Sequence, residues 1–117
     1  MSDRTSPDPA ISMIYVTCGS VHEAQQIGET VVRERLAACA NILDGMRAIY
    51  WWEGEVQEGD EAVLILKTAA ANVPTLSARV KALHSYDVPC VTEIPLGRGN
   101  ADYFDWIIAE SSGSNKD

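Results

Sequence analysis

Basic residues and long apolar runs are scarce in this sequence. Nine lysines and arginines stand against 17 aspartates and glutamates, a formal net charge of −8 at pH 7. Proteins that bind nucleic acid or anionic membrane surfaces need a basic face, so we expect neither kind of partner. No apolar run approaches the roughly 20 residues that cross a bilayer, which also excludes a membrane-spanning helix.

Histidine and cysteine are scarce too. The two histidines leave little room for a histidine-based hydrolase. Three distant cysteines form no disulfide framework, which favours a reduced, cytoplasmic protein. Gly-rich phosphate loops, Gly-x-Ser-x-Gly and the closely spaced Cys or His pairs of zinc sites are all missing. We therefore expect no enzyme, no catalytic or cofactor-binding residues and no required cofactor.

The length of 117 residues and the hydrophobic share of 46 % predict one globular domain. Both ends of the chain are polar and lack apolar periodicity. We predict disordered tails at 1–10 and 111–117 and a single folded domain at 11–110. The N-terminal stretch has no apolar segment of the kind found in a signal peptide.

Apolar patterning predicts elements in the order β-α-β-β-α-β-α. Runs rich in β-branched and aromatic residues predict strands, and apolar residues three and four apart predict helices. Ser20 with Glu23 forms a capping box, in which the serine bonds forward and the glutamate bonds back. The predicted strands are 11–18, 39–56 with a bulge or bend at Asp44-Gly45, 61–67 and 88–95; the predicted helices are 21 to about 38, 72–84 and a short one capped by Asn100; the predicted hairpin turn is 57–60.

This order predicts an α+β fold, the ferredoxin-like βαββαβ plait, with a long hairpin between the second and third strands and a short C-terminal helix. Two helices cover only one face of such a sheet. The stretches 13–16 and 62–66, however, are apolar without alternation, so their second face also needs cover. The simplest cover is another copy of the chain. We therefore expect an oligomer, of a size that the pattern does not fix.

Five segments in sequence order resemble the divalent-cation tolerance family, the CutA-like proteins. The resemblance spans about 11–110 and implies a ferredoxin-like fold, a homotrimer, no established reaction, and a link to tolerance of copper and other divalent metals. The architecture is also similar to that of PII signalling trimers, which bind small molecules between subunits. The segments are Leu36–Ile42, Tyr50–Glu55, Leu66–Thr68, His84–Pro89 and Tyr103–Ile107.

The chain departs from this family at the positions that matter most for a metal. Some bacterial members are assigned a copper site from a first-strand cysteine and two adjacent histidines. His84 stands at the second histidine position, but Leu83 replaces the first, and Val16 replaces the cysteine. Cys18 lies two residues further on, and Cys90 stands where the family has glutamate. The resemblance therefore implies an incomplete site and weak binding of copper or another divalent cation.

The candidate metal ligands are Cys18, Cys39 and His84, because thiolate and imidazole suit copper. Each also has a structural interpretation. The two cysteines can be small buried apolar residues, and His84 can cap the C-terminus of its helix. His22 is interpreted as surface.

Five carboxylates crowd the predicted hairpin turn. They can attract hard cations, or they can keep an exposed edge soluble, and we favour the second. The residues are Glu53, Glu55, Glu58, Asp60 and Glu61.

Four further residues are predicted at an interface or cleft: Trp52, Lys67, Tyr86 and Trp106. Adjacent Trp51 and Trp52 point to opposite faces of their strand, so one can pack within its subunit and the other against a neighbour. Lys67 can pair with a carboxylate or hold a small anion between subunits.

Two functions therefore stand side by side. The first is a non-enzymatic trimer that binds metal weakly and contributes to metal tolerance. The alternative is a PII-like signalling trimer that binds a small anionic ligand or a partner protein at clefts between subunits, with Lys67, Arg47 and Arg98 as the charges to test. An enzyme using Tyr86 or Lys67 is the least favoured.

Overall fold

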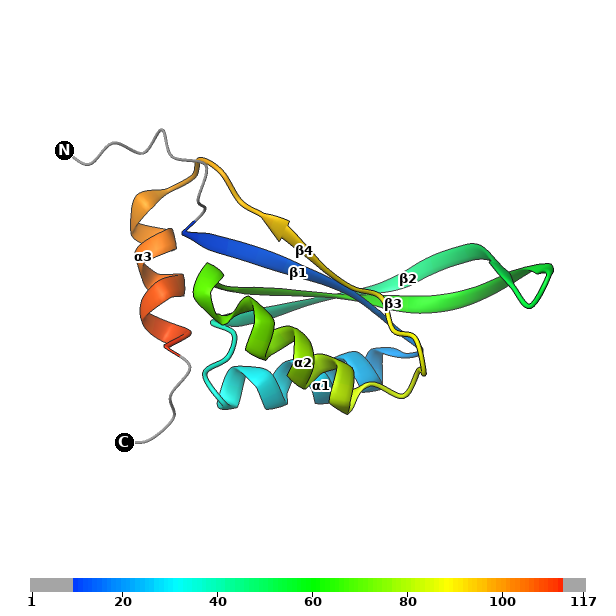
Figure 1. Cartoon of the computed structure of the whole chain (residues 1–117). Helices are drawn as coiled ribbons and strands as arrows, with labels where there is room; N and C mark the ends of the chain where they lie inside the picture. The colour runs from blue at the N-terminus through cyan, green and yellow to red at the C-terminus, as the bar shows by residue number, and fades with distance from the viewer. Residues whose placement is uncertain (1–9, 113–117) are drawn as a thin grey trace.

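The structure is a computed structural model that describes residues 10–112 (Figure 1). It contains one four-stranded antiparallel sheet in the order β2-β3-β1-β4 and three α-helices. The α+β class and the predicted order of elements are confirmed. No helix within 10–112 has both the length and the apolar character needed to cross a membrane. The elements are β1 (Ile11–Cys18), α1 (Val21–Arg33), β2 (Cys39–Trp52), β3 (Glu55–Ala69), the 3-10 turn η1 (Ala70–Asn72), α2 (Val73–Leu83), β4 (Val91–Pro95) and α3 (Ala101–Glu110).

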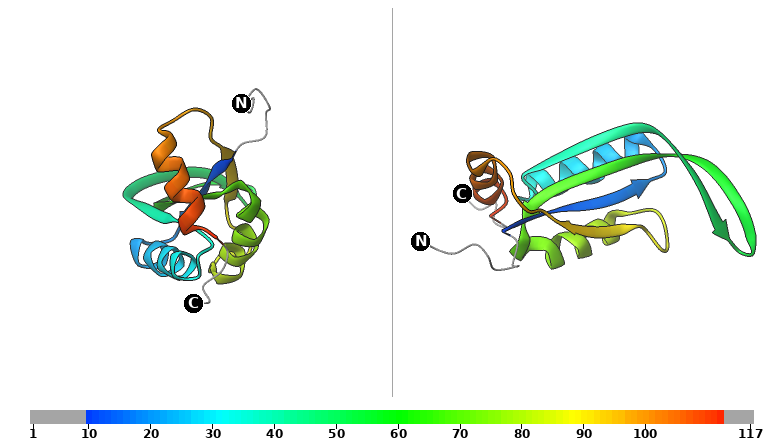
Figure 2. Two further views of the ribbon diagram at one scale, coloured as in Figure 1. Left: turned by 90° about the vertical axis from the view of Figure 1, so that its left-hand side faces the viewer. Right: turned by 90° about the horizontal axis from the view of Figure 1, so that it is seen from above.

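Helices α1 and α2 lie side by side on one face of the sheet and enclose the core (Figure 2). Gly28 lets α1 approach the sheet closely, since a Cβ there would lie only 3.0 Å from that of Ala40. The C-terminal helix α3 packs at one end of the sheet through Ile107. The fully buried large side chains of the main core are Ile14, Val16, Leu64, Leu66, Val31, Leu76 and Val80.

The opposite face of the sheet carries no helix over most of its length. Met13 and Tyr15 of β1 point to this face and pair in register with Lys67 and Ile65 of β3, and all four are only half-buried. The apolar residues on this second face of β1 and β3 are therefore left without full cover by α1 and α2 of the same chain.

The β2–β3 hairpin projects well beyond the body and gives the molecule its longest dimension, 53 Å (Figures 1 and 2). Its turn is Glu53-Gly54, with φ of 52° and 82°, as in a two-residue hairpin turn. The predicted turn at 57–60 is therefore wrong, because Gly59 lies within β3 and pairs with Ala48. The bulge at Asp44-Gly45 is confirmed by a register shift between Leu43 and Met46.

Several predicted boundaries also shift. Helix α1 ends at Arg33 rather than near residue 38, and Arg35 has a positive φ of 64° that stops it from continuing. Strand β4 begins at Val91, three residues later than predicted. Ser111, assigned to the C-terminal tail, is buried and donates to the carbonyl of Ile107. The rest of the predicted tails, 1–9 and 113–117, lies outside the described residues.

Candidate functional site

A thiol, a carboxylate and an imidazole meet where the end of β1, the first turn of α1 and the end of α2 come together. The candidate ligand atoms of Cys18, Glu23 and His84 all lie within 4.8 Å of one another. Cys18 ends β1, Glu23 follows the N-cap of α1, and His84 is the C-cap of α2. The structure thus brings together two of the three predicted ligands and adds a carboxylate.

His84 is enclosed and hydrogen-bonded at both ring nitrogens. Its Nδ1 accepts from the backbone N–H of Tyr86 at 3.1 Å, so its Nε2 carries the proton and donates to the Thr17 carbonyl at 2.8 Å. The predicted position of His84 as the cap of its helix is confirmed. The Oε2 of Glu23 lies 3.6 Å from Nδ1. His84 therefore links the end of α2 to β1.

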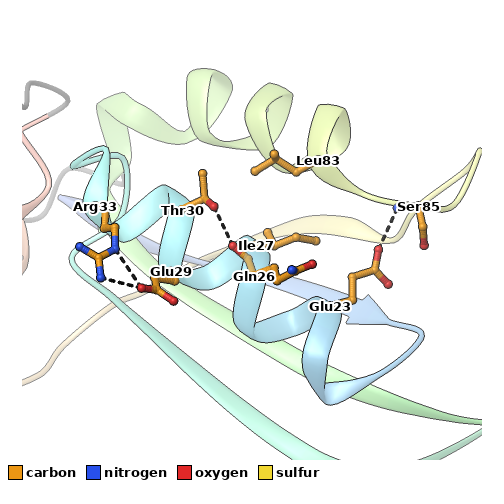
Figure 3. A pocket seen from close by; sticks show the side chains of 8 residues that line it. All are labelled: Glu23, Gln26, Ile27, Glu29, Thr30, Arg33, Leu83 and Ser85. Carbon is orange, nitrogen blue, oxygen red and sulfur yellow. Dashed lines mark hydrogen bonds and ion pairs between the residues drawn. The ribbon is translucent and has the colours of Figure 1, made fainter.

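Glu23 holds the same junction from the side of α1. The Ser20 hydroxyl accepts from the N–H of Glu23 at 3.1 Å, as the capping box predicts. The Glu23 carboxylate, however, accepts from the backbone N–H of Gly19 at 3.1 Å. It also accepts from the backbone N–H of Ser85 at 2.8 Å (Figure 3). Burial alone would raise the pKa of Glu23, but these hydrogen bonds and the nearby imidazole outweigh burial and lower it.

A groove borders Glu23 on the outer side of the helices. It has a volume of about 800 Å³ and runs between α1 and the end of α2 (Figure 3). Its lining is polar and carries an ion pair between Arg33 and Glu29, 2.6 Å apart. Glu23 and Ser85 line one end of this groove, so Glu23, with 17 % of its side chain exposed, is the member of the Cys18–Glu23–His84 cluster that borders solvent here.

The thiol of Cys18 is the least accessible of the three groups. It is completely buried in the core. Burial, reinforced by the carboxylates of Glu23 and Glu61, raises its pKa to about 12. Cys18 is therefore a protonated thiol at neutral pH, and a metal has to displace that proton in order to bind sulfur.

Tyr86 connects this cluster to the open face of the sheet. Its ring lies 4.7 Å from the His84 ring, and its hydroxyl donates to Glu61 at 2.8 Å. Burial and the Glu61 carboxylate raise the pKa of Tyr86 well above its ordinary value. Tyr86 is thus a hydrogen-bond donor at neutral pH.

Cys39, the third predicted ligand, lies away from the cluster, at the start of β2 opposite Lys67 of β3. Its sulfur is 3.8 Å from the Tyr103 hydroxyl. That hydroxyl accepts from the Lys67 ammonium at 3.2 Å, and the Tyr103 ring stacks on Trp106 at 5.8 Å. Cys39 thus joins a set of contacts beside α3 that combines aromatic rings with a cation, and within 10–112 it belongs to no group of three or more candidate metal ligands.

The hairpin differs from prediction in two ways. Trp51 and Trp52 remain 73 % and 52 % exposed, so neither packs into the core of its own chain. The carboxylates are not gathered at the tip, because Glu58 and Asp60 lie within β3 and both pair with Arg47 of β2, at 3.3 and 3.1 Å. The interpretation of these acids as a solvated, strand-protecting set fits this pairing.

Sequence reasoning placed Glu23 in a cap and missed it as a candidate ligand. Its position in the sequence could have indicated this role, because a residue in the first turn of α1 lies beside the end of the preceding strand, where Cys18 is. The approach of His84 to both depends on how α2 packs, which no local pattern contains.

Comparison with known proteins gives consistent matches. The family model described as "CutA1 divalent ion tolerance protein" matches residues 12–110. "Divalent-cation tolerance protein CutA" of Thermus thermophilus is 44 % identical over 95 residues, covering 81 % of this chain and 92 % of the relative. "Protein CutA 1, chloroplastic" of Oryza sativa subsp. japonica is 38 % identical over 107 residues, 92 % of this chain and 60 % of that protein.

Solved structures match the fold as well. The structure of the divalent cation tolerance protein Cut A1 from Thermus thermophilus superposes with a TM-score of 0.83 and 42 % identity, covering 86 % of this chain and 98 % of that one. The matched family segment covers almost the whole described region, from β1 to the end of α3. The chain therefore belongs to the CutA1 divalent ion tolerance family.

Proposed function

We propose that this chain is a non-enzymatic metal-tolerance protein that binds copper or another divalent ion weakly at Cys18, Glu23 and His84. The observation that carries the proposal is the convergence of these three ligand atoms within 4.8 Å. Sulfur, nitrogen and oxygen donors together suit copper and zinc rather than calcium or magnesium. The names of the relatives, which refer to divalent-cation tolerance, support the same interpretation.

Weak binding follows from what the cluster already does. Both nitrogens of His84 and both oxygens of Glu23 are occupied by hydrogen bonds, which a metal has to replace in part. Removing the Cys18 proton costs about 4 kcal/mol more at a pKa of about 12 than at the ordinary 9.0, roughly a thousandfold in affinity. A metal can therefore bind these three residues only by displacing hydrogen bonds and a proton that they hold in the folded chain.

Copper titration of matched variants tests the assignment. We expect His84→Ala and Cys18→Ser, each of which removes a direct ligand, to weaken binding by at least the roughly 10- to 100-fold that loss of an outer-shell partner costs. Cys39→Ser and a hairpin variant with Glu58, Asp60 and Glu61 neutralised should keep the parent affinity. Loss of binding in the hairpin variant alone would move the site to the carboxylates. A parent without copper affinity would end the metal proposal for this chain.

We further propose that the chain assembles as a homotrimer, in the cytoplasm. The half-buried sheet face and the exposed hairpin aromatics, which one chain leaves open, support assembly. Sedimentation at micromolar concentration should give one species near three times 12.7 kDa. A monomer would contradict the trimer. The location rests on the sequence alone, and the rice relative is named as chloroplastic.

The alternative, a PII-like trimer with a small anionic ligand, receives less support from the charges. Arg47 is paired with two carboxylates across the hairpin, and Lys67 donates to Tyr103. A thermal-shift screen of metals against nucleotides and small carboxylates separates the two functions, because a ligand of the native state stabilises it. A shift with an anion and none with metals would favour signalling.

A further inference from the structure

The loop of residues 85–90 begins at the proposed metal cluster and joins α2 to β4 (Figure 1). Two consecutive backbone amides hold its start. The Ser85 N–H donates to Oε2 of Glu23 at 2.8 Å, and the Tyr86 N–H donates to Nδ1 of His84 at 3.1 Å. Within residues 10–112, the other hydrogen bonds of this loop come from two side chains, and neither reaches α1 or α2. The hydrogen bonds that fasten the loop to the helices therefore end on two candidate metal ligands.

A metal at this cluster would use the same acceptor atoms. The Nε2 of His84 carries the proton that it donates to the Thr17 carbonyl, so Nδ1 holds the acceptor lone pair of the ring. Nδ1 is also the ring nitrogen that lies 3.6 Å from Oε2 of Glu23. Because this nitrogen has a single lone pair, a metal on Nδ1 excludes the Tyr86 N–H. A carboxylate oxygen has two, so Glu23 can bind a metal and still accept from Ser85.

Tyr86 is bound at both of its ends. Its amide is held by the cluster, and its hydroxyl donates to Glu61 of β3 at 2.8 Å. Glu61 pairs in register with Met46 of β2, directly beyond the bulge, and we call this pair the hairpin base. Tyr86 lines a hollow on the open face of the sheet, the face that the proposed trimer covers with neighbouring copies. A change at the Tyr86 amide therefore reaches the hairpin base through a single side chain.

We propose that the cluster is a metal sensor, in which metal binding releases the start of the loop 85–90 and alters the contact of Tyr86 with the hairpin base. This inference rests on the proposed metal site. A metal on Nδ1 of His84 takes the acceptor of the Tyr86 amide, and the Ser85 amide is then the last hydrogen bond from the loop to the helices. By linkage, metal occupancy and the position of the loop affect each other equally. The role goes beyond weak binding of an ion, because occupancy is carried to the face where copies meet.

Amide hydrogen exchange of the full-length chain, resolved by residue with NMR and measured with and without saturating zinc(II), tests the proposal. Zinc is diamagnetic and accepts the same mixed donors. We expect the Tyr86 amide to exchange about fivefold faster with zinc, the effect of losing one ordinary hydrogen bond. The Ser85 amide should change less. The Gly19 amide, which donates to the other oxygen of Glu23, is the internal control and should not change.

The outcomes separate this inference from the metal proposal itself. Saturable zinc binding with an unchanged exchange rate at Tyr86 would overturn the sensor and leave the metal site standing. Equal acceleration at Gly19 and Tyr86 would mean that the whole junction loosens, and it would also overturn the sensor. So would the absence of saturable zinc binding, in which case the copper titration above decides whether the metal site itself stands.

A matched pair of tyrosine variants tests the path to the hairpin base. In the parent, saturating zinc should shift the amide resonances of Glu61 and Met46. Tyr86→Phe removes the hydroxyl bond to Glu61 and keeps the amide, so zinc should still accelerate exchange at position 86 while the shifts at the hairpin base become smaller. Tyr103→Phe removes a hydroxyl away from the cluster and should keep the full response. Equal shifts at the hairpin base in the two variants would overturn the role of Tyr86.

Discussion

The regions around Cys18 and Cys39 differ in almost every physical respect, although both cysteines adjoin strands of one sheet. Cys18 is buried between a carboxylate and an imidazole, and its proton is held tightly. Cys39 is half-buried beside a tyrosine hydroxyl that also accepts from Lys67. The first region contains a set of metal donors that the fold already uses, and the second contains aromatic packing with a cation. The residue type alone therefore does not decide which thiol can bind a metal.

The largest expected difference is in how metal affinity depends on pH. If Cys18 is the sulfur ligand, each metal ion bound releases one proton from a thiol with a pKa of about 12. Affinity should then rise about tenfold per pH unit, or about a hundredfold from pH 7 to 9. A thiol with the ordinary pKa of 9.0 would instead lose this slope as the pH approaches 9. Competition titrations at several pH values measure the slope, and a plateau below pH 9 would exclude Cys18.

The second prediction concerns the carboxylate that holds the Cys18 region together. Glu23→Gln should lower the free energy of unfolding by about 1–3 kcal/mol at pH 7, because the amide cannot accept from both backbone N–H groups. The same substitution at Glu29, which faces solvent on α1 and pairs with Arg33, should cost less than about 0.5 kcal/mol. Denaturant unfolding measures both.

The effect of Glu23→Gln should also depend on pH, with a defined sign. The pKa of Glu23 is lowered in the folded state, so the unfolded chain takes up this proton first as pH falls. The contribution of Glu23 is complete above its unfolded value, near 4.5, and is lost at lower pH. Parent and variant should therefore converge in stability in acid. A gap that stays constant from pH 7 to 3 would contradict the account.

A substitution in the Cys39 region should lower the free energy of unfolding less than Glu23→Gln does. Lys67→Met removes the ammonium that donates to the Tyr103 hydroxyl and lies 5.5 Å from the centre of its ring. We expect a loss of less than about 1 kcal/mol in the free energy of unfolding, because such contacts near the surface are weak. Metal affinity should not change. A loss several times larger would mean that Lys67 has a buried partner, as at an interface between copies.

The smallest effect is expected at the ends of the chain. Deletion of 1–9 and 113–117 should leave the melting temperature nearly unchanged. A longer deletion that also removes Ser111 and Ser112 should lower it, because Ser111 accepts from the Ala69 N–H and donates to Ile107. These two bonds contribute on the order of 1 kcal/mol each. Equal melting temperatures for the two deletions would show that the cap of α3 contributes nothing.

The fold was predicted correctly from the sequence where local periodicity is strong. The hairpin turn was misplaced, because two polar segments were candidates for it. Strand β1 and helix α2 lie within a residue of their predicted bounds. The hairpin turn was placed at 57–60, where charge and a glycine gather, yet Glu53-Gly54 adopts the positive φ that a two-residue turn requires. Both segments contain glycine, and only cross-strand register distinguishes them.

The candidate site was predictable in part for a related reason. Cys18 and His84 followed from donor chemistry and resemblance, but their contact depends on α2 returning along the sheet beside α1. Glu23 was assigned a local role in capping, and it also bonds Ser85, 62 positions later in the chain. Long-range hydrogen bonds of this kind leave no periodic signal. Cys39 could not be separated from Cys18 by sequence, because burial and neighbours make the difference.

One measurement tests the central claim that Cys18 is the sulfur ligand of the metal. Cobalt(II) bound through a thiolate gives a sulfur-to-metal charge-transfer band in the near ultraviolet, which carboxylate or imidazole ligands alone do not give. We predict the band in the parent and in Cys39→Ser at mildly alkaline pH, and its loss in Cys18→Ser. A band that survives in Cys18→Ser and disappears in Cys39→Ser would contradict the account.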